Sequence, residues 1–581
     1  MRPFLQYIPE RSKLLLLSLM VGVLSGCAAV VLDGAIHSVR HWLGQGFLRG
    51  SYDWQYLILP GIGMLVSLLL VRLVIRDNIG HGVTKVLLAV SRNESKIKPH
   101  NIWSSMLTSS VTIGFGGSVG AEAPIVYTGA AIGSNLGRVF GLSYRNITLL
   151  LGCGAAGAVA GIFKAPLAAV LFTLEILLYN VSLKSLLPLL ISTVSATVVS
   201  YIFRGQTPVF ACSLTPFSMA NIPFYLILGV AGGFGSLYFM RTTLRLEDRI
   251  GKGRNPYLRW LLCALVLGLL IFLFPPLYGE GYDSLGDLLN GRPMEMEGRS
   301  PLSFLLASRW GVPCLFLLIF LLKVIAMTAT NAGGGVGGTF GPTLFSGGIL
   351  GFVVARCINL AGGGVPEQNF VLVGMAALMA GVMQAPMTAI FLIAEISGGY
   401  DLLIPLILTS TVSFGTLRIF ERYSIYTKRI AQSGDLLTHD SDQAVLTLMH
   451  VDDLIRDKYP RVHIDAPLRE IIPVISESDA AVLAVLDSKG RFQGMVDLTA
   501  TRRVLFDPSK YDVLRVYNIM ESAPEYIYAG EKMESVMNKF DRTGAWRLPA
   551  VDDSRRYLGF VSRSRLLTHY RQELKEISSE D

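Results

Sequence analysis

The sequence predicts a polytopic α-helical membrane protein that ends in a small α/β module outside the membrane. Of its 581 residues, 51% are hydrophobic and only 16% are charged, and the mean hydropathy is +0.49. A soluble chain of this length is normally less apolar. After Arg429 the long apolar runs give way to charged, amphipathic sequence. A bilayer is therefore the expected solvent for the first three quarters of the chain.

Apolar stretches of nearly the ~20 residues that cross a bilayer recur along this part. The first is interpreted as a retained helix and not a signal peptide, because no small-residue cleavage pattern followed by a soluble domain appears. The clearest stretches are Leu14–Val30, Leu57–Val74, Phe224–Met240, Trp260–Leu277 and Pro313–Ala329.

Charge indicates how the chain is oriented. Arg2, Arg11 and Lys13 precede the first stretch with only Glu10 against them, which places the N-terminus in the cytosol by the positive-inside rule. The net charge of +8 is attributed to this topology and to lipid headgroups, so we expect no nucleic acid partner. The six cysteines lack metal-ligand spacing, and we expect no metal site.

An internal repeat is visible in the membrane part. The segment Ala165–Ile176 matches Ala385–Ile396, 220 positions later, and Gly120–Pro124 matches Gly338–Pro342, 218 positions later. Recurrent packing of small residues could explain the composition. It does not explain why Glu175 and Glu395 stand equally far from their prolines. Two homologous halves, at about 14–205 and 222–426, are predicted, with the substrate at their interface.

The glycine-rich segments Gly114–Pro124 and Gly333–Pro342 indicate where that substrate binds. Irregular backbone at membrane depth survives only where it is buried in protein or lines a water-filled path. Each segment leads through a proline into a helix, whose N-terminal N–H groups attract anions. The predicted substrate is therefore a small anion.

Four motifs resemble those of the CLC chloride channel and transporter family. The segment Gly120–Pro124 (GAEAP) is similar to G-[KR]-E-G-P, and Gly338–Pro342 (GTFGP) to G-x-F-x-P. Gly80–Thr84 (GHGVT) is similar to G-S-G-x-P, and Tyr426 stands where the family has its pore tyrosine. The resemblance implies the CLC fold, built from two inverted repeats within residues 1–430, and transport of chloride as the bound ion.

The resemblance also implies roles for individual residues. Glu122 is the expected gate, whose carboxylate occupies an anion site and leaves it on protonation. The amides of Thr339 and Phe340 and the Tyr426 hydroxyl are expected around a central chloride, and Gly80, His81, Gly82, Gly120 and Ala121 complete the expected anion-binding set. A lone acid in an apolar stretch favours a functional role by itself. The alternative is a helix N-cap, and both can hold.

Two departures from the family pattern leave alternatives open. His81 replaces the family's filter serine, and Thr84 its proline. The histidine either donates a hydrogen bond to the anion or faces away and leaves the amides of Gly80 and Gly82 to bind it. Anion selectivity is open for that reason.

The second departure is Ile176, where exchangers of this family usually carry an inner glutamate. Because isoleucine cannot titrate, we expect a passive, voltage- or pH-gated chloride channel, with chloride/proton exchange as the alternative. Glu175 and Glu395 are expected to be structural acids paired with backbone amides or another helix. A nucleotide-sensing scaffold without transport is a third hypothesis, disfavoured by the glycine-rich motifs. An enzyme is not expected, because no nucleophile–base pair appears.

The polar tail resembles two tandem CBS repeats, at 446–506 and 511–571, after a linker at 431–445. Such modules often bind adenine nucleotides, which would use Thr499, Ser562 and Ser564 here, but Ala500 and Arg565 replace the ribose-binding aspartate. A regulatory or dimer-stabilising module without nucleotide is therefore expected, with nucleotide binding as the alternative. No cofactor is expected to be required.

The resemblance further implies a homodimer with one pore in each subunit. The apolar segments Leu183–Val199 and Leu402–Phe414 lie where relatives make their subunit contact. We expect a multi-pass protein of the cell membrane, the inner membrane in a bacterium, with the CBS module in the cytosol.

Overall fold

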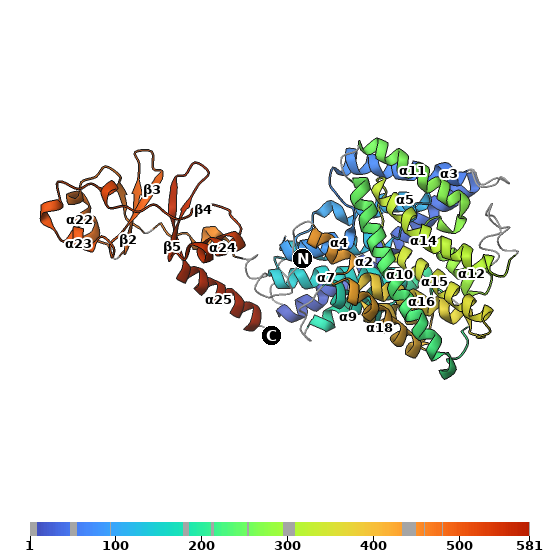
Figure 1. Ribbon diagram of the computed structural model, residues 1–581. Helices are drawn as coiled ribbons and strands as arrows, with labels where there is room; N and C mark the ends of the chain where they lie inside the picture. The colour runs from blue at the N-terminus through green and yellow to red at the C-terminus, as the bar shows by residue number, and fades with distance from the viewer. Residues whose placement is uncertain are drawn as a thin grey trace. The chain divides into compact units, whose positions relative to one another are not determined.

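The computed structural model describes residues 9–46, 55–92, 94–177, 185–210, 214–251, 255–293, 308–432, 449–457, 459–478 and 480–579. The chain divides into two compact units, Met1–Leu437 and Thr438–Asp581 (Figure 1). Each unit is described by itself. The predicted linker at 431–445 lies, after its first two residues, outside the described residues.

Within the described ranges, the named secondary-structure elements of the first unit are all helices. Nine helical segments there are long and apolar enough to cross a membrane. They contain four of the five predicted stretches in full and most of the fifth, Trp260–Leu277, whose helix ends at Leu273, so the prediction of a polytopic membrane protein is confirmed. The other four segments contain more glycine or polar residues, which is why hydropathy alone marked them less clearly: Tyr144–Phe163, Leu186–Arg204, Phe340–Leu360 and Leu403–Ile430.

The helices occur in two similar series. The first half contains α2 (Glu10–Gly46), α3 (Gln55–Leu69), α4 (Gly82–Arg92), α5 (Ser104–Gly114), α6 (Glu122–Val139), α7 (Tyr144–Phe163), α8 (Pro166–Phe172) and α9 (Leu186–Arg204). The second contains α10 (Ile222–Gly251), α11 (Pro256–Leu273), α12 (Tyr282–Leu289), α14 (Gly311–Ala332), α15 (Phe340–Leu360), α16 (Glu367–Met383), α17 (Pro386–Ile396), α18 (Leu403–Phe420) and α19 (Ile425–Gln432).

Matched glycines let matched helices cross closely. In the first half α6 packs against α7, and a Cβ added at Gly129 would lie 2.1 Å from the Gly154 carbonyl oxygen. In the second half α15 packs against α16, and a Cβ at Gly347 would lie 2.5 Å from the Gly374 oxygen. Small residues permit this close backbone approach in membranes. The repeat seen in the sequence is therefore also a repeat of packing.

The same turn ends α7 and α16. Lys164 and Gln384 each adopt a left-handed conformation, with φ of 57° and 52°. An alanine and a proline follow, and proline is well suited to the first position of α8 and α17. Two short helices thus point into the molecule from equivalent places.

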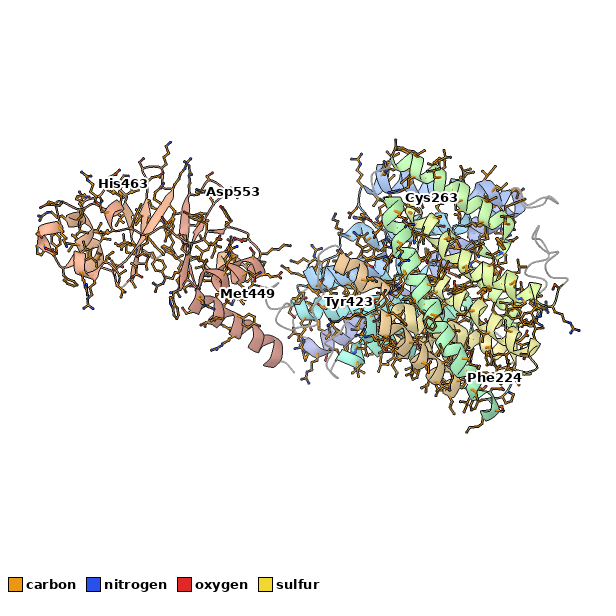
Figure 2. All side chains as sticks on the ribbon, viewed as in Figure 1. Phe224, Cys263, Tyr423, Met449, His463 and Asp553 are labelled. Carbon is orange, nitrogen blue, oxygen red and sulfur yellow. The ribbon has the colours of Figure 1, made fainter. Side chains whose placement is uncertain are left out.

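Apolar side chains fill the space between these helices (Figure 2). Cys263 on α11, labelled there, is buried, and so is Cys153 on α7. Five of the six cysteines lie in the described residues, and none of these five forms a disulfide bond. Cys153 and Cys263 therefore pack in the interior of the first unit.

The second unit contains two three-stranded sheets of identical topology. In each sheet the middle strand pairs with a parallel strand on one side and an antiparallel strand on the other. The strands are β1 (Arg461–His463), β2 (Val482–Leu486), β3 (Phe492–Asp497), β4 (Ile527–Tyr528), β5 (Arg547–Val551) and β6 (Tyr557–Ser562). The main helices are α22 (Leu468–Ser476), α24 (Met533–Thr543) and α25 (Arg563–Ser579). Matching alternation of strand and helix agrees with two repeats.

Candidate anion-transport site

The two glycine-rich segments meet each other inside the first unit. The Gly120 N–H donates to the Gly338 carbonyl oxygen at 3.0 Å, and the Gly338 N–H donates to the Gly120 oxygen at 2.7 Å. This antiparallel bridge joins the two halves of the repeat. It also brings together the N-termini of α6 and α15, which begin two residues further on in each segment.

Glu122, the first residue of α6, lies at this junction and is buried. Its Oε2 accepts the Gly341 N–H at 3.2 Å, and its Oε1 accepts the hydroxyl of Tyr282. The carboxylate therefore occupies the N-terminal end of α15, where the helix dipole favours negative charge. Glu122 thus contacts the N-terminus of a helix that belongs to the other half of the molecule.

Thr339, Phe340 and Tyr426, the residues predicted around a central anion, are all buried. Thr339 and Phe340 directly precede Gly341, so their amides lie beside the one that reaches Glu122. The hydroxyls of Thr339 and Tyr426 are buried and interact with each other, but neither has a hydrogen bond of regular geometry to a described residue. Buried hydroxyls without a well-formed hydrogen bond are costly, and an anion is a ligand that would accept from both.

The segment Gly80–Gly82 does not present all of the groups that were expected to bind the anion. The Gly80 N–H donates to the Asn78 side chain at 3.1 Å, so this amide is used in a local turn. His81 has φ of 56°, and its Nε2 lies 3.9 Å from Glu247 Oε1. Gly82 begins α4 so close to α6 that an added Cβ would lie 2.3 Å from the Ala123 oxygen. In this conformation His81 faces a carboxylate.

Ile176 is buried, in a π-helical turn at Thr173–Leu177. Its neighbour Glu175 accepts hydrogen bonds from the backbone at the start of α17, and Glu395 accepts from the start of α8. Both acids have the contacts with backbone amides of another helix that the sequence predicted. Neither is therefore a free replacement for an inner acid at position 176.

Four charged or polar residues near Glu122 were missed by the sequence interpretation. Besides Tyr282, Glu280 accepts the Ala121 N–H at 3.1 Å and lies 4.0 Å from Arg40 of α2. Lys323 of α14 is fully buried and donates to the Gly279 oxygen at 2.9 Å. A lysine inside the apolar run Pro313–Ala329 was a usable signal, because intramembrane charges usually have a function or a partner. Glu280 lies in the short loop after a span and Tyr282 begins the short helix α12, so no periodicity marks either residue.

The residues proposed for a nucleotide lie just after matched strands of the second unit. The Thr499 N–H donates to Asp497 at the end of β3, at 2.8 Å. Ser562 ends β6, and its hydroxyl lies 3.5 Å from that of Ser564. Arg565, at the position of the ribose-binding aspartate, donates to the Asp453 carbonyl oxygen. Thr499 thus belongs to one sheet and the two serines to the other.

The fold and this junction define an anion-transporting membrane protein. Residues 62–418 match the family model of the voltage gated chloride channel, and residues 516–572 match the model of the CBS domain. The first match covers more than half of the chain. The protein belongs to the voltage gated chloride channel family, so anion transport across a membrane is its activity.

Among the relatives, some are named exchange transporters and others chloride channels. The chain is 28% identical over 421 residues to the H(+)/Cl(-) exchange transporter ClcA of Vibrio cholerae, covering 68% of this chain and 84% of that one. It is 28% identical over 424 residues to the chloride channel protein CLC-e of Arabidopsis thaliana, covering 67% and 57%. A solved slow cyanobacterial Cl-/H+ antiporter superimposes with a TM-score of 0.62 at 22% identity, covering 73% and 98%.

Proposed function

We propose that the protein exchanges chloride for protons and that Glu122 takes part in both movements. The sequence favoured a passive channel because Ile176 replaces the inner acid. The comparisons support the alternative better, because similar proteins and structures are named exchangers or antiporters. The family model alone covers both channels and exchangers.

The observation that carries the proposal is the hydrogen bond from Gly341 to the Glu122 carboxylate. The carboxylate uses the N-terminal amide of α15, next to the amides expected to bind the anion. A carboxylate and a chloride compete for the same positive helix end. A proton on Glu122 removes its charge and lets the anion in, so protonation and anion binding are linked.

Ile176 restricts the inner end of the proton route without closing it. Its side chain is buried among apolar residues, so it provides no acid there. A proton that leaves Glu122 towards the cytosol must then move through water or through another titratable group.

The test uses sealed vesicles that contain the pure protein and a chloride gradient, without a proton gradient. An exchanger moves protons uphill while chloride runs down its gradient, and Glu122→Gln should abolish the proton movement but keep chloride flux. Asp248→Asn, a change at an exposed acid of α10, is the matched control. Chloride flux without uphill proton movement in the wild type would establish a passive channel.

We also propose a homodimer that uses α9 and α18. Both helices carry apolar side chains that are exposed in the single chain, including Val194 (50%) and Ile407 (47%). Exposed apolar surface in a membrane faces either lipid or a second subunit. In a background without native cysteines, Val194→Cys should cross-link two chains, whereas Leu265→Cys on α11 should not. Equal cross-linking at both positions would contradict this interface.

We propose that the CBS module regulates transport and that an adenine nucleotide is its candidate ligand. Ser562 and Ser564 lie together at the end of β6. Calorimetry of the full-length protein with ATP would show binding, and Ser562→Ala should weaken it. Heat exchange identical to that of a buffer blank would favour a module without nucleotide. We propose that the N-terminus and this module lie in the cytosol. If the source is a bacterium, the membrane that the protein spans is the inner membrane.

A further inference from the structure

The geometry points to Tyr282 as the residue that holds the Glu122 carboxylate in the anion path. Tyr282 is a positioning residue in this inference, because it acts on the anion through Glu122. The inference rests on the proposed gating role of Glu122 and adds a second component to the gate. Tyr282 would then hold the gate from the side of the molecule where it lines a surface pocket.

Two donors from different elements fix the two carboxylate oxygens. The Tyr282 hydroxyl, from the first residue of α12, donates to Oε1, and the Gly341 N–H of α15 donates to Oε2. A Cβ added at Gly341 would lie 3.1 Å from the Tyr282 oxygen and 3.0 Å from Glu122 Oε1. The tyrosine, the glutamate and the α15 backbone are therefore in contact at one point.

The backbone and the ring of Tyr282 are themselves fixed. Gly281 precedes it with φ of 90°, a left-handed conformation that turns the chain into α12, and an added Cβ there would lie 2.4 Å from the Phe345 ring. The edge of the Tyr282 ring meets Phe210 at a centroid distance of 5.6 Å and an angle of 83°. Because the ring is already held in place, the Tyr282 hydroxyl loses little conformational entropy when it donates its hydrogen bond to Glu122.

Tyr282 also lines a surface pocket, together with Phe210, Asp283 and Asp287. Arg40, near the C-terminal end of α2, lies 3.8 Å from Asp283 at this pocket. Arg40 follows Lys13 by 27 residues of one helix, roughly 40 Å along its axis, which exceeds the ~30 Å hydrocarbon core. The pocket therefore opens on the side opposite the start of α2.

The other charged groups near the pair come from four elements. Glu280 lies on the loop before α12 and interacts electrostatically with Glu122, and Asp283 is on α12 itself. Arg40 and Asp33 come from α2 and Lys323 from α14, all acting on Glu280. Among these neighbours, Tyr282 is the group whose hydrogen bond reaches the Glu122 carboxylate.

A hydroxyl that donates to a carboxylate stabilises its charged form more than its neutral form. Tyr282 thus favours the ionised, inserted state of Glu122 and opposes its protonation and release. Without this donor, a lower proton concentration should suffice to open the path. The pH at which chloride flux is half-maximal should then rise by roughly one unit, a tenfold change in proton concentration.

The experiment compares the pH profile of chloride flux in vesicles for three variants. Tyr282→Phe should shift the midpoint upward. Tyr278→Phe should not, because the neighbouring Tyr278 hydroxyl donates to the Gly114 oxygen instead. In Glu122→Gln the profile should be flat, and adding Tyr282→Phe to it should change nothing further.

The outcomes separate the inference from the gate on which it rests. A flat profile in Glu122→Gln with an unshifted profile in Tyr282→Phe would overturn the inference and keep the gate. An unchanged pH response in Glu122→Gln would overturn both. If Tyr282→Phe does not fold, 3-fluorotyrosine at position 282 replaces it. Its hydroxyl is a stronger donor, so the midpoint should fall, and a midpoint that rises or stays would overturn the inference.

Discussion

Glu175 and Glu395 each cap a helix in the opposite half of the molecule. The carboxylate of Glu395 accepts the N–H groups of Leu167 and Ala168 at 3.1 and 2.9 Å, at the start of α8. Glu175 accepts those of Met387 and Thr388 at 3.0 and 2.7 Å, at the start of α17. A negative group at a helix N-terminus satisfies free donors and complements the dipole. The exchange of caps ties the two halves together.

Loss of either cap should therefore destabilise the whole first unit. Glu395→Ala leaves two backbone donors without an acceptor, at a cost of about 2 kcal/mol. Glu395→Gln keeps one acceptor oxygen and should cost less. Thermal unfolding of the detergent-solubilised protein would show the order wild type, Gln variant, Ala variant. Asp248→Asn serves as control, and an Ala variant as stable as this control would contradict the capping role.

Lys323 and Glu280 form a charge pair inside the first unit. Removing one of the two charges should cost more stability than removing both. The two charges attract each other, and Lys323 is fully buried. Lys323→Met removes one partner and should cost about 1–3 kcal/mol, because the Gly279 oxygen loses its donor while Glu280 keeps Arg40 at 4.0 Å and the Ala121 N–H. Lys323→Met with Glu280→Gln removes both charges and should recover part of that loss. The same thermal assay compares them, and an additive double variant would show that the pair does not act together.

His81 is expected to have little influence on the choice between chloride and nitrate. Its ring faces Glu247, which Arg429 holds at 2.7 Å, so it does not act on the anion in this conformation. Loss of a direct hydrogen bond to an anion would cost about 1.5–3 kcal/mol, more than a tenfold change. We expect His81→Ser to change the flux ratio of the two anions by less than about tenfold. His100→Ala is the matched control, and a larger change confined to His81→Ser would show that the histidine donates to the anion.

The CBS unit should lose stability in acid through Glu531. Burial raises the pKa of Glu531, but hydrogen bonds from Lys539, Ser535 and the Tyr528 N–H outweigh it, and the pKa lies below its ordinary value of 4.5. A lowered folded-state pKa gives stability that is present above the unfolded value and is lost as pH falls through the folded one. Its size is of order 1 kcal/mol after allowance for solvent screening.

Glu531→Gln removes this titration without changing the size of the side chain. Hydrogen exchange of α24 in the full-length protein, corrected for intrinsic rates, should show lower protection than wild type at pH 7. The difference should shrink below about pH 4. The exposed Glu534→Gln is the control. A difference that stays constant with pH would mean that Glu531 acts through shape and not charge.

The sequence predicted the features that depend on residues close to one another along the chain. Apolar length gave five spans, and the duplicated glycine and proline signals located the N-termini of α6 and α15. The family resemblance placed Glu122, and the structure shows it buried at that junction. Which backbone amides Glu175 and Glu395 would accept from could not be predicted, because each carboxylate and its donor amides lie more than 200 positions apart.

Tyr282 and Glu280 were missed for a related reason. Each depends on which loop reaches the junction, and loops carry no hydrophobic period from which to place them. Lys323 was visible in principle, as a charge inside an apolar run. The choice of a channel over an exchanger rested on the inner glutamate that Ile176 replaces. The absence of one acid restricts the proton route but does not decide between the two transport mechanisms.

The reciprocal bridge between Gly120 and Gly338 has a consequence for biosynthesis. Translation produces Glu122 more than 200 residues before Gly341 exists, so the first half emerges before the backbone partner of this acid has been made. The transport pathway is therefore assembled last, when the second half folds against the first. Neither half expressed alone should transport, whereas co-expression of residues 1–213 with 214–581 offers a way to rebuild the pathway from two polypeptides.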